Sequence, residues 1–274
     1  MITYTIGGGF IASHLPYKQI LNRFQPTRQS VFDTLDQYPD ADVFVNTLGR
    51  CGTKNIDSCE NDKQSVIDAN TYLPMLFAQY CEEKKKKLIN ISSGCVNYGV
   101  SPRGKGYGWR EIDQPQPLSF YSKSKFAADQ ILLGYSNCLM FRIRMPISHK
   151  NSPRNLLNKL LSYSQILEEP NSVTFVEDLV KGVAWGIENN KSGIYNFTNP
   201  QVLTHTRILE VYNNYSPIKH IFTKLTPKEL DKITLAPRSN CILDCEKLNN
   251  EGFLLGNSEE MLEKTIINYT GNHE

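Results

Sequence analysis

The fold of this chain is decided by its first residues, Ile2-Thr3-Tyr4-Thr5-Ile6-Gly7-Gly8-Gly9-Phe10-Ile11-Ala12. The first five residues form a short apolar and β-branched run, which predicts a buried strand. The next six fit the pattern G-x-G-x-x-A, whose glycines permit a tight turn and a close approach of the backbone to a pyrophosphate. Placed directly after a strand, this loop indicates dinucleotide binding rather than a plain turn. The cofactor contacts expected in it are those of Gly7, Gly9, Phe10 and Ile11.

Apolar runs alternate with helix-like stretches through the first half of the chain. Strands are predicted at residues 2–6, 43–46, 88–92 and 139–142, and helices at 30–37, 64–82 and 118–133. The run 19–24 is read as a further strand, and Pro16 limits the helix after the glycine loop to a short one. Such alternation predicts an α/β fold, a Rossmann-type doubly wound parallel sheet with helices on both faces. Ligands bind such sheets beyond the carboxyl ends of the strands.

The pattern changes after residue 146. Helices are predicted at 155–164, 178–189 and 259–268 and a strand at 173–176, and the run 193–197 follows as a further short element. We therefore expect an NADP-binding domain at residues 1–146. A smaller C-terminal α/β substrate-binding region is expected at 147–274, with some of its elements joining the first sheet.

Composition narrows the class of protein. The chain has 274 residues, 40% of them hydrophobic, and a net charge of +2, which favours neither a nucleic-acid nor a membrane partner. No basic segment with a following apolar stretch opens the sequence, and no run approaches the roughly 20 residues needed to span a bilayer, so a cytoplasmic location is expected. The seven cysteines show no paired zinc-ligand spacing, which predicts free thiols and no metal site. The lysine run 84–87 is interpreted as a solvated helix end.

Tyr121 and Lys125 carry the candidate chemistry. Four residues apart on a predicted helix, they project from one face, so the ammonium can lie beside the phenol. A free phenol has a pKa of about 10, and a nearby cation favours the phenolate and brings its proton within reach of transfer. Ser93, after the strand at 88–92, supplies a hydroxyl that can bind a carbonyl oxygen. The three residues together predict a ketone reductase.

Several segments resemble the extended short-chain dehydrogenase/reductase family, and within it the bifunctional 3,5-epimerase/4-reductases that make UDP-L-rhamnose. The similar segments are Ser92-Ser93-Gly94-Cys95, Ser119-Phe120-Tyr121-Ser122-Lys123, Arg142-Ile143-Arg144-Met145-Pro146-Ile147-Ser148, Ser152-Pro153-Arg154-Asn155, Tyr195-Asn196-Phe197-Thr198-Asn199-Pro200 and Ala236-Pro237-Arg238-Ser239-Asn240. The resemblance implies conversion of UDP-4-keto-6-deoxyglucose to UDP-L-rhamnose, by inversion at C3 and C5 and NADPH reduction at C4.

This resemblance assigns further residues. The 4-keto group acidifies the protons on both neighbouring carbons, so epimerisation needs a base on one face and an acid on the other. Cys95, two residues after Ser93, is expected to reach the same side, and a thiol can exchange such a proton if a cation lies nearby. Lys159 matches a lysine of the rhamnose-forming pattern and is the expected partner, with a solvated surface lysine as the alternative. Asn155, Arg238 and Asn240 match substrate-binding positions.

The cofactor side follows the family less closely. Glycine is usual in the family at the position of Ile6, so the turn is expected to be carried by Gly7 and Gly8. Thr47, Leu48 and Gly49 resemble the element that closes over the adenosine side. The segment from Arg23 to Arg28 lacks an acidic residue suited to a ribose 2′-hydroxyl and offers two guanidinium groups, which favours NADPH over NADH.

Two alternative functions remain at this stage. One is a monofunctional 4-ketorhamnose reductase acting on a dTDP or UDP sugar, with Cys95 a bystander. The other is a catalytically silent subunit that binds the dinucleotide and regulates a partner. On the leading interpretation the partners are a nucleotide-sugar substrate and a separate 4,6-dehydratase that supplies it. The helices 64–82 and 118–133 could form the seam of a homodimer or could equally face solvent, and both alternatives stay open.

Overall fold

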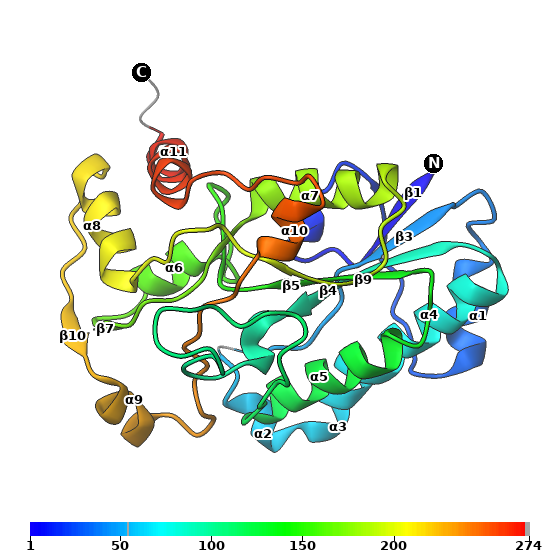
Figure 1. Cartoon of the computed structure of the whole chain (residues 1–274), viewed down its shortest axis with the longest axis horizontal. Coiled ribbons are helices and arrows are strands. Elements are labelled where there is room, and N and C mark those ends of the chain that lie inside the picture. Colours follow the sequence, from blue (N-terminus) through cyan, green and yellow to red (C-terminus); the bar gives the residue numbers. More distant parts are fainter. Residues whose placement is uncertain (54, 272–274) are drawn as a thin grey trace.

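The computed structural model describes residues 1–53 and 55–271. Its centre is a six-stranded parallel sheet in the order β2-β1-β3-β4-β5-β9 (Figure 1). The bounds are β1 Thr3–Ile6, β2 Lys18–Ile20, β3 Val43–Asn46, β4 Lys87–Ser93, β5 Cys138–Ile143 and β9 Gly193–Phe197. The predicted α/β fold with a Rossmann-type sheet is confirmed. The strand expected at 19–24 is shorter and starts one residue earlier.

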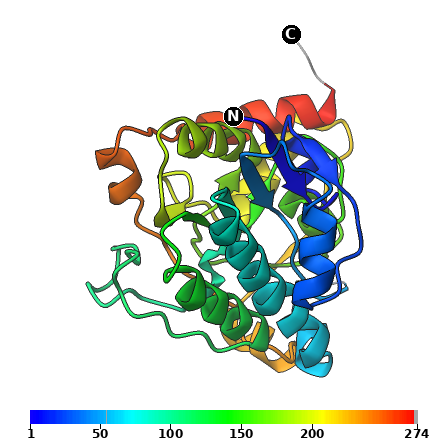
Figure 2. The same ribbon diagram turned by 90° about the vertical axis from the view of Figure 1, so that its right-hand side faces the viewer.

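Helices cover both faces of this sheet. One face carries α1 (Arg28–Leu35), α4 (Leu73–Glu83) and α5 (Phe120–Leu132), while α7 (Val176–Glu188) and α10 (Glu246–Asn250) lie on the other (Figure 2). Alternate residues of each strand enter two separate cores. In β4, for example, Leu88 packs on the α4 side and Ile89 on the α7 side.

The chain order reverses next to β1. The chain runs from β1 to β2 on one side, and β3 then pairs with β1 on the other side. This reversal opens a crevice at the carboxyl ends of β1 and β3, the usual ligand site of doubly wound sheets. Only one 3₁₀ turn, η1 (Ala12–His14), follows the glycine loop, as Pro16 predicts.

The helix predicted over residues 64–82 is divided into three parts. It consists of α3 (Lys63–Ile67), the π-helix η2 (Asp68–Tyr72) and α4, and the short α2 (Ser58–Asn61) precedes it. A π-helical turn inside a longer helix is frequent at functional sites. Asn70 lies in this turn, and its side chain donates a hydrogen bond to the Ser124 Oγ of α5.

The second half forms its own core next to the carboxyl ends of the strands. Its elements are β6 (Pro146–Ile147), α6 (Leu156–Leu161), β7 (Gln165–Leu167), β8 (Thr174–Phe175), α8 (His205–Tyr215), β10 (Thr223–Leu225), α9 (Pro227–Ile233) and α11 (Ser258–Thr270). The helices α6, α8 and α11 pack around β6, β7 and β8. The division of the chain at residue 146 stays a prediction. Two elements from beyond that residue join the first half, because β9 is a strand of the large sheet and α7 packs against that sheet.

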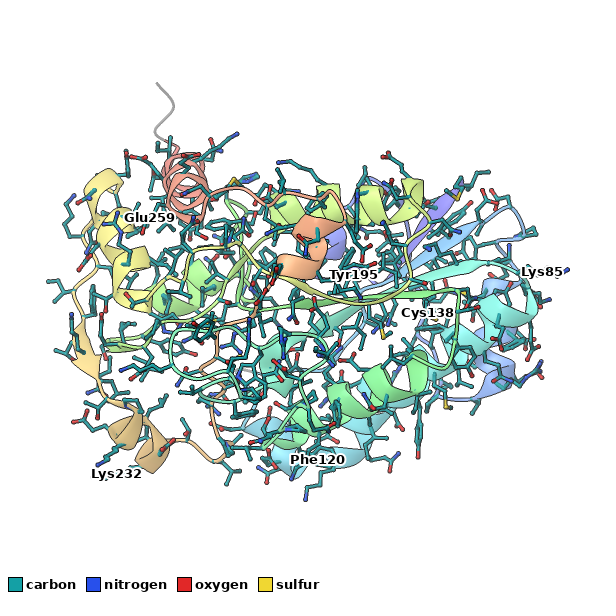
Figure 3. All side chains as sticks on the ribbon, in the orientation of Figure 1. Lys85, Phe120, Cys138, Tyr195, Lys232 and Glu259 are labelled. Carbon is teal, nitrogen blue, oxygen red and sulfur yellow. The ribbon has the colours of Figure 1, made fainter. Side chains whose placement is uncertain are left out.

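The lysine run lies at the far end of the molecule from this half. Figure 3 shows Lys85 at one end of the long axis and Lys232 of α9 at the other. Lys84 pairs with Asp36 at 2.8 Å, and the ammonium groups of Lys86 and Lys87 bind main-chain carbonyls. Three of the four lysines thus bind groups in other parts of the chain. Lys84 and Lys85 are exposed as predicted for a solvated helix end, but Lys87 is buried in β4.

Candidate active site

Ser93 and Cys95 are placed by the end of β4. Ser93 is the last residue of the strand and caps the 3₁₀ turn η3 (Gly94–Val96), with its Oγ accepting a hydrogen bond from the Cys95 amide at 3.2 Å. The Ser93 side chain is buried and the Cys95 side chain is partly exposed. Both residues therefore lie at the carboxyl edge of the sheet, where substrates of this fold bind.

Tyr121 and Lys125 face this edge from the first two turns of α5. Ser119 caps the helix by accepting a hydrogen bond from the Ser122 amide. Burial raises the pKa of Tyr121 well above its ordinary value, the Cys95 and Cys51 thiols add to that shift, and a hydrogen bond with Ser93 opposes it. The expected lowering of the Tyr121 pKa by Lys125 is therefore wrong for this structure. The phenol is held protonated, the form that can donate a proton to a developing alkoxide.

Lys125 is buried against the loop that follows β3. Burial is the largest influence on its pKa, which is lowered. A Cβ at Gly49 would lie 3.1 Å from the Lys125 Nζ and 3.3 Å from the Asn70 Oδ1. The absence of a side chain at Gly49 thus lets the ammonium and the amide approach the backbone of this loop.

Asn70 is a site residue that the sequence analysis missed. Its amide donates hydrogen bonds to the Arg50 carbonyl and the Ser124 Oγ, and its Oδ1 accepts one from the Arg50 amide. It is completely buried on η2. A polar residue on the core-facing side of the predicted helix was the signal that could have found it.

The glycine loop takes the form expected of a dinucleotide cradle. Gly7 adopts a φ of +106°, and a Cβ there would lie 2.9 Å from both Leu48 and Thr47. Gly8 has no positive φ, so Gly7 alone carries the turn that was assigned to both residues. No atom lies within 4 Å of a Cβ built on Gly9, so this backbone faces open space as a phosphate cradle requires. Phe10 is buried beneath the loop, next to the half-buried Ile11.

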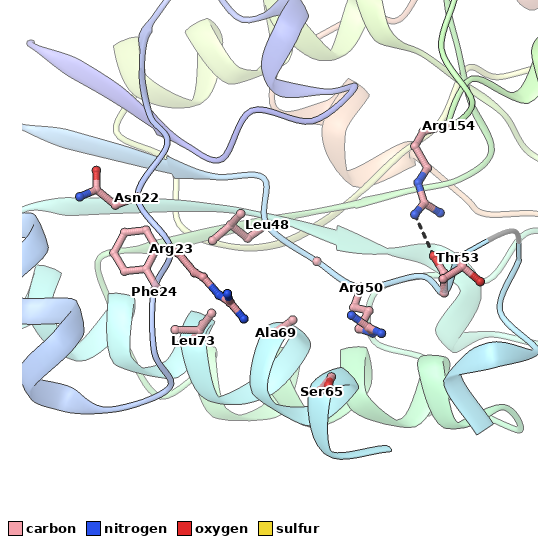
Figure 4. A pocket seen from close by; sticks show the side chains of 12 residues that line it. Asn22, Arg23, Phe24, Leu48, Arg50, Thr53, Ser65, Ala69, Leu73 and Arg154 are labelled. Carbon is pink, nitrogen blue, oxygen red and sulfur yellow. Dashed lines mark hydrogen bonds between the residues drawn. The ribbon is translucent and has the colours of Figure 1, made fainter. Parts of the chain in front are cut away.

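A cavity of about 430 Å³ extends from the loop after β3 and contains Arg23. Figure 4 shows the Arg23 side chain passing Leu48 and reaching over Leu73 into this cavity. Arg28 does not line it. Its guanidinium pairs with Glu83 at 2.7 Å and lies 3.9 Å from the Phe32 ring centroid. The assignment of Arg28 to the cofactor is therefore wrong, because both its partners belong to the surface between α1 and α4.

A second cavity of about 560 Å³ lies between the sheet edge and the second half of the chain. It brings together four of the predicted residues, Cys95, Lys159, Arg238 and Asn240. Arg154 lines both cavities, and its guanidinium donates hydrogen bonds to the Cys51 Sγ and the Gly52 carbonyl. The two cavities therefore adjoin at Arg154.

Lys159 enters the second cavity from α6. Burial lowers its pKa, the Cys51 and Cys95 thiols oppose that shift, and Arg154 adds to it. A lysine with lowered proton affinity can donate and accept protons more readily near neutral pH. Lys159 and Cys95 both line this cavity, so the two groups face a common space.

Arg238 and Asn240 line the same cavity from the segment between α9 and α10. The Arg238 guanidinium binds both carboxylate oxygens of Asp57, at 2.7 and 2.9 Å, and holds the pKa of Asp57 below its ordinary value. The Asn240 Oδ1 accepts a hydrogen bond from Asn171 at 3.2 Å. Both side chains line the cavity with polar atoms that a nucleotide diphosphate could use.

Asn155 does not reach the cavity, and its assignment to substrate is wrong. The side chain is fully buried at the start of α6. Its Oδ1 accepts hydrogen bonds from the Ser148 and Leu157 amides, and its Nδ2 donates to the Ser148 and Lys150 carbonyls. These bonds use its hydrogen-bonding capacity. Asn155 is a helix cap that positions the helix of Lys159.

Residues 1–53 and 55–271 contain no group of three or more histidine, cysteine or acidic side chains arranged to hold a metal ion. Within the same ranges, no helix combines the length and the apolar character needed to cross a membrane.

A parallel sheet with a glycine loop after β1, together with Ser93, Tyr121 and Lys125 at its carboxyl edge, defines the short-chain dehydrogenase/reductase class. Within that class, the chain belongs to the RmlD substrate binding domain family, whose model matches residues 40–270. The resemblance noted in the sequence is thus confirmed at the level of the family.

Two relatives from one plant are similar over most of the chain. A bifunctional dTDP-4-dehydrorhamnose 3,5-epimerase/dTDP-4-dehydrorhamnose reductase of Arabidopsis thaliana is 36% identical over 97% of this chain and 85% of the relative. A trifunctional UDP-glucose 4,6-dehydratase/UDP-4-keto-6-deoxy-D-glucose 3,5-epimerase/UDP-4-keto-L-rhamnose-reductase of the same plant is 36% identical over 82% of this chain. The chain spans 34% of the length of that trifunctional protein.

Solved structures share the fold. The L780 UDP-rhamnose synthase of Acanthamoeba polyphaga mimivirus superposes with a TM-score of 0.88 at 24% identity, covering 97% of this chain and 99% of that one. A dTDP-4-dehydrorhamnose reductase of Bacillus anthracis in complex with NADP gives a TM-score of 0.84 at 18% identity, covering 97% and 98%.

Proposed function

We propose that this chain is a bifunctional 3,5-epimerase/4-reductase that converts UDP-4-keto-6-deoxy-D-glucose to UDP-L-rhamnose with NADPH. The observation that carries the proposal is the convergence of two sets of groups on one site. Tyr121, Lys125 and Ser93 supply the reductase chemistry, and Cys95 and Lys159 supply an acid–base pair in the adjoining cavity. The bifunctional Arabidopsis relative, 36% identical, has both activities in its name.

The epimerisation steps follow from the positions of Cys95 and Lys159. With the C4 carbonyl held by the Ser93 hydroxyl, the Cys95 thiolate removes the proton from C3 or C5. The C–H electron pair moves toward the carbonyl oxygen, giving an enolate that the Ser93 hydroxyl stabilises. The Lys159 ammonium then delivers a proton to the opposite face of the same carbon, which inverts it.

The reduction step uses the other set of groups. A nicotinamide dinucleotide fits the residues present, because Gly9 faces open space, Arg23 extends into the adjoining cavity and Gly49 lies beside Lys125. Bound there, it supplies a hydride to C4. Tyr121 donates its proton to the resulting alkoxide oxygen, and the nearby Lys125 ammonium stabilises the phenolate left behind. Arg23 is the guanidinium we propose for the 2′-phosphate of NADPH, with NADH as the weaker alternative.

The substrate requires a 4,6-dehydratase, which we propose acts before this chain. In the trifunctional relatives that activity is part of the protein's name. We further propose a cytoplasmic location and a homodimer formed through α4 and α5.

The test is product analysis in D₂O. Purified chain, NADPH and UDP-4-keto-6-deoxy-D-glucose should yield UDP-L-rhamnose that carries deuterium at C3 and C5, seen by NMR and mass spectrometry. Cys95→Ala should lose this product yet still reduce UDP-4-keto-L-rhamnose. Turnover of the already epimerised ketone alone by the wild type would instead establish the monofunctional reductase, and no turnover of either ketone would leave only a dinucleotide-binding subunit.

A further inference from the structure

Arg144 carries a buried charge that the proposed mechanism has not yet used. It follows β5, and its side chain is 1% exposed. Arg142, two residues earlier, is equally buried, but its guanidinium pairs with the Asp129 carboxylate at 2.8 Å. No carboxylate of the described residues forms a salt bridge with Arg144. A buried guanidinium without a counterion is costly, so its retention calls for an anionic partner.

The contacts of Arg144 show which partner that is. Its Nη2 donates to the Asn171 Oδ1 at 2.5 Å and to the Ser239 carbonyl at 2.7 Å. Its Nη1 donates to the Ser239 Oγ at 2.8 Å and to the Cys95 Sγ at 3.5 Å. The Ser239 and Asn171 acceptors are permanently neutral. Cys95 is the one group among these contacts that can become an anion.

The surrounding backbone is built to bring the guanidinium to this sulfur. A Cβ on Gly94 would lie 2.9 Å from the Arg144 Cγ, so the arginine stem passes directly over the glycine between Ser93 and Cys95. Met145 takes a φ of +41°, an unfavourable value for a residue with a side chain. The Arg144 amide donates to the Thr174 Oγ1, and its carbonyl accepts from the Thr174 amide, which fixes this turn.

Other charged and titratable groups face Cys95 from the neighbouring elements. They are Tyr121 of α5, Lys159 of α6, and Cys241 in the irregular segment between α9 and α10. Tyr121 and Cys241 are neutral when protonated. Burial favours loss of the Lys159 charge, whereas a guanidinium keeps its charge under all ordinary conditions.

We propose that Arg144 is the positioning residue that holds the Cys95 sulfur in place and stabilises its negative charge when it removes the proton from the carbon next to the ketone. The assignment rests on the proposed epimerase function. In the step, the C–H bond breaks and an S–H bond forms, and the C–H electron pair moves to the ketone oxygen. Arg144 exchanges no proton. It orients the sulfur and stabilises its charge before the transfer.

The direct test measures thiolate rather than turnover. The full chain is treated with iodoacetamide over a range of pH, and alkylation of the Cys95 peptide is followed by mass spectrometry. Arg144→Gln should slow alkylation of Cys95 near neutral pH by about tenfold, with the rate recovering at higher pH. Arg144→Lys should recover part of this loss. Cys51, whose sulfur is bound by Arg154 and not by Arg144, is the internal control and should keep its profile.

If Arg144→Gln does not fold, a second variant, Asn171→Asp, tests the same contact between Arg144 and Cys95. Asn171→Asp retains the shape of the side chain and places a carboxylate against the Arg144 Nη2. It should shift the Cys95 profile in the same direction, because the guanidinium then has a competing anion. An unchanged Cys95 profile in a folded Arg144→Gln or Asn171→Asp protein overturns the assignment.

Failure of the proposed function gives a different result. If the wild-type protein exchanges no deuterium into the keto sugar while the alkylation profile still shifts in the variants, the epimerase proposal fails and the pairing of Arg144 with Cys95 stands. A different result supports both proposals. The wild-type protein exchanges deuterium into the keto sugar, and Arg144→Gln exchanges it more slowly at low pH but recovers at the higher pH where its Cys95 is again alkylated.

Discussion

Acid should destabilise this protein through His205, the first residue of α8 in the wall of the second cavity. Its Nε2 lies 3.4 Å from the Met145 Sδ. Burial lowers the pKa of His205 from 6.5 to about 4, the Arg144 charge adds to that shift, and Glu168 opposes it. The folded protein therefore holds this ring neutral at pH values where the unfolded chain protonates it.

The sign and size of the effect follow from proton linkage. Because the folded-state pKa is lower than the unfolded one, the unfolded chain binds more protons between pH 6.5 and about 4, and stability falls as the pH falls through that window. Integrating from about pH 7 to about pH 5 with these two values gives a loss of roughly 2 kcal/mol attributable to this ring. For a chain of this size that is a decrease of roughly 3 °C in Tm.

The assay is urea unfolding at both pH values, followed by tryptophan fluorescence, for the wild type and His205→Gln. The substitution should remove roughly 2 kcal/mol from the difference in stability between the two pH values. Met145→Leu, which removes the sulfur contact but keeps the titrating ring, should retain the wild-type difference. An equal loss of stability on acidification in the wild type and His205→Gln would refute the reasoning.

Three further predictions follow from individual contacts. Asp129→Asn should lower the free energy of unfolding by roughly 3–5 kcal/mol in denaturant titrations, because it leaves the Arg142 charge buried without a counterion. Gly49→Ala places a methyl group 3.1 Å from the Lys125 Nζ and should reduce kcat for NADPH oxidation by roughly 10- to 100-fold, with normal thermal stability; unchanged kcat would exclude this crowding. Arg23→Ala should raise the KM for NADPH by about tenfold or more and leave that for NADH nearly unchanged, so an equal effect on both would remove Arg23 from the 2′-phosphate.

Much of the fold is readable from the sequence because buried parallel strands are short apolar runs. Val43–Asn46 was predicted to the residue, and the strands at 2–6, 88–92 and 139–142 to within one residue at each end, whereas the run 19–24 extends four residues beyond the end of β2. Because the strand ends could be predicted, the positions of the glycine loop and of the residues just after β3 and β4 at the carboxyl edge of the sheet could be predicted too. Local sequence therefore suffices wherever the structure depends on burial and on neighbours along the chain.

The errors concern contacts between distant parts of the chain. Arg28 was assigned to the cofactor because the segment from Arg23 to Arg28 contains no acidic residue. Its actual partner, Glu83, lies 55 residues away and cannot be recognised from the local sequence. The proximity of Arg144 to Cys95, 49 residues apart, depends on the pairing of β4 with β5. Asn155 is a different case, since an asparagine before Leu156 and Leu157 is a helix-cap signal that the sequence itself offered.

The central claim is that one site holds two separable chemistries. Tyr121→Phe tests it most directly, because the variant lacks the proton donor for reduction but keeps Cys95 and Lys159. Incubated with UDP-4-keto-6-deoxy-D-glucose and NADPH in D₂O, it should incorporate deuterium at C3 and C5 while NADPH absorbance stays constant. Loss of exchange together with reduction, in a variant that is folded and binds NADPH, would contradict the account.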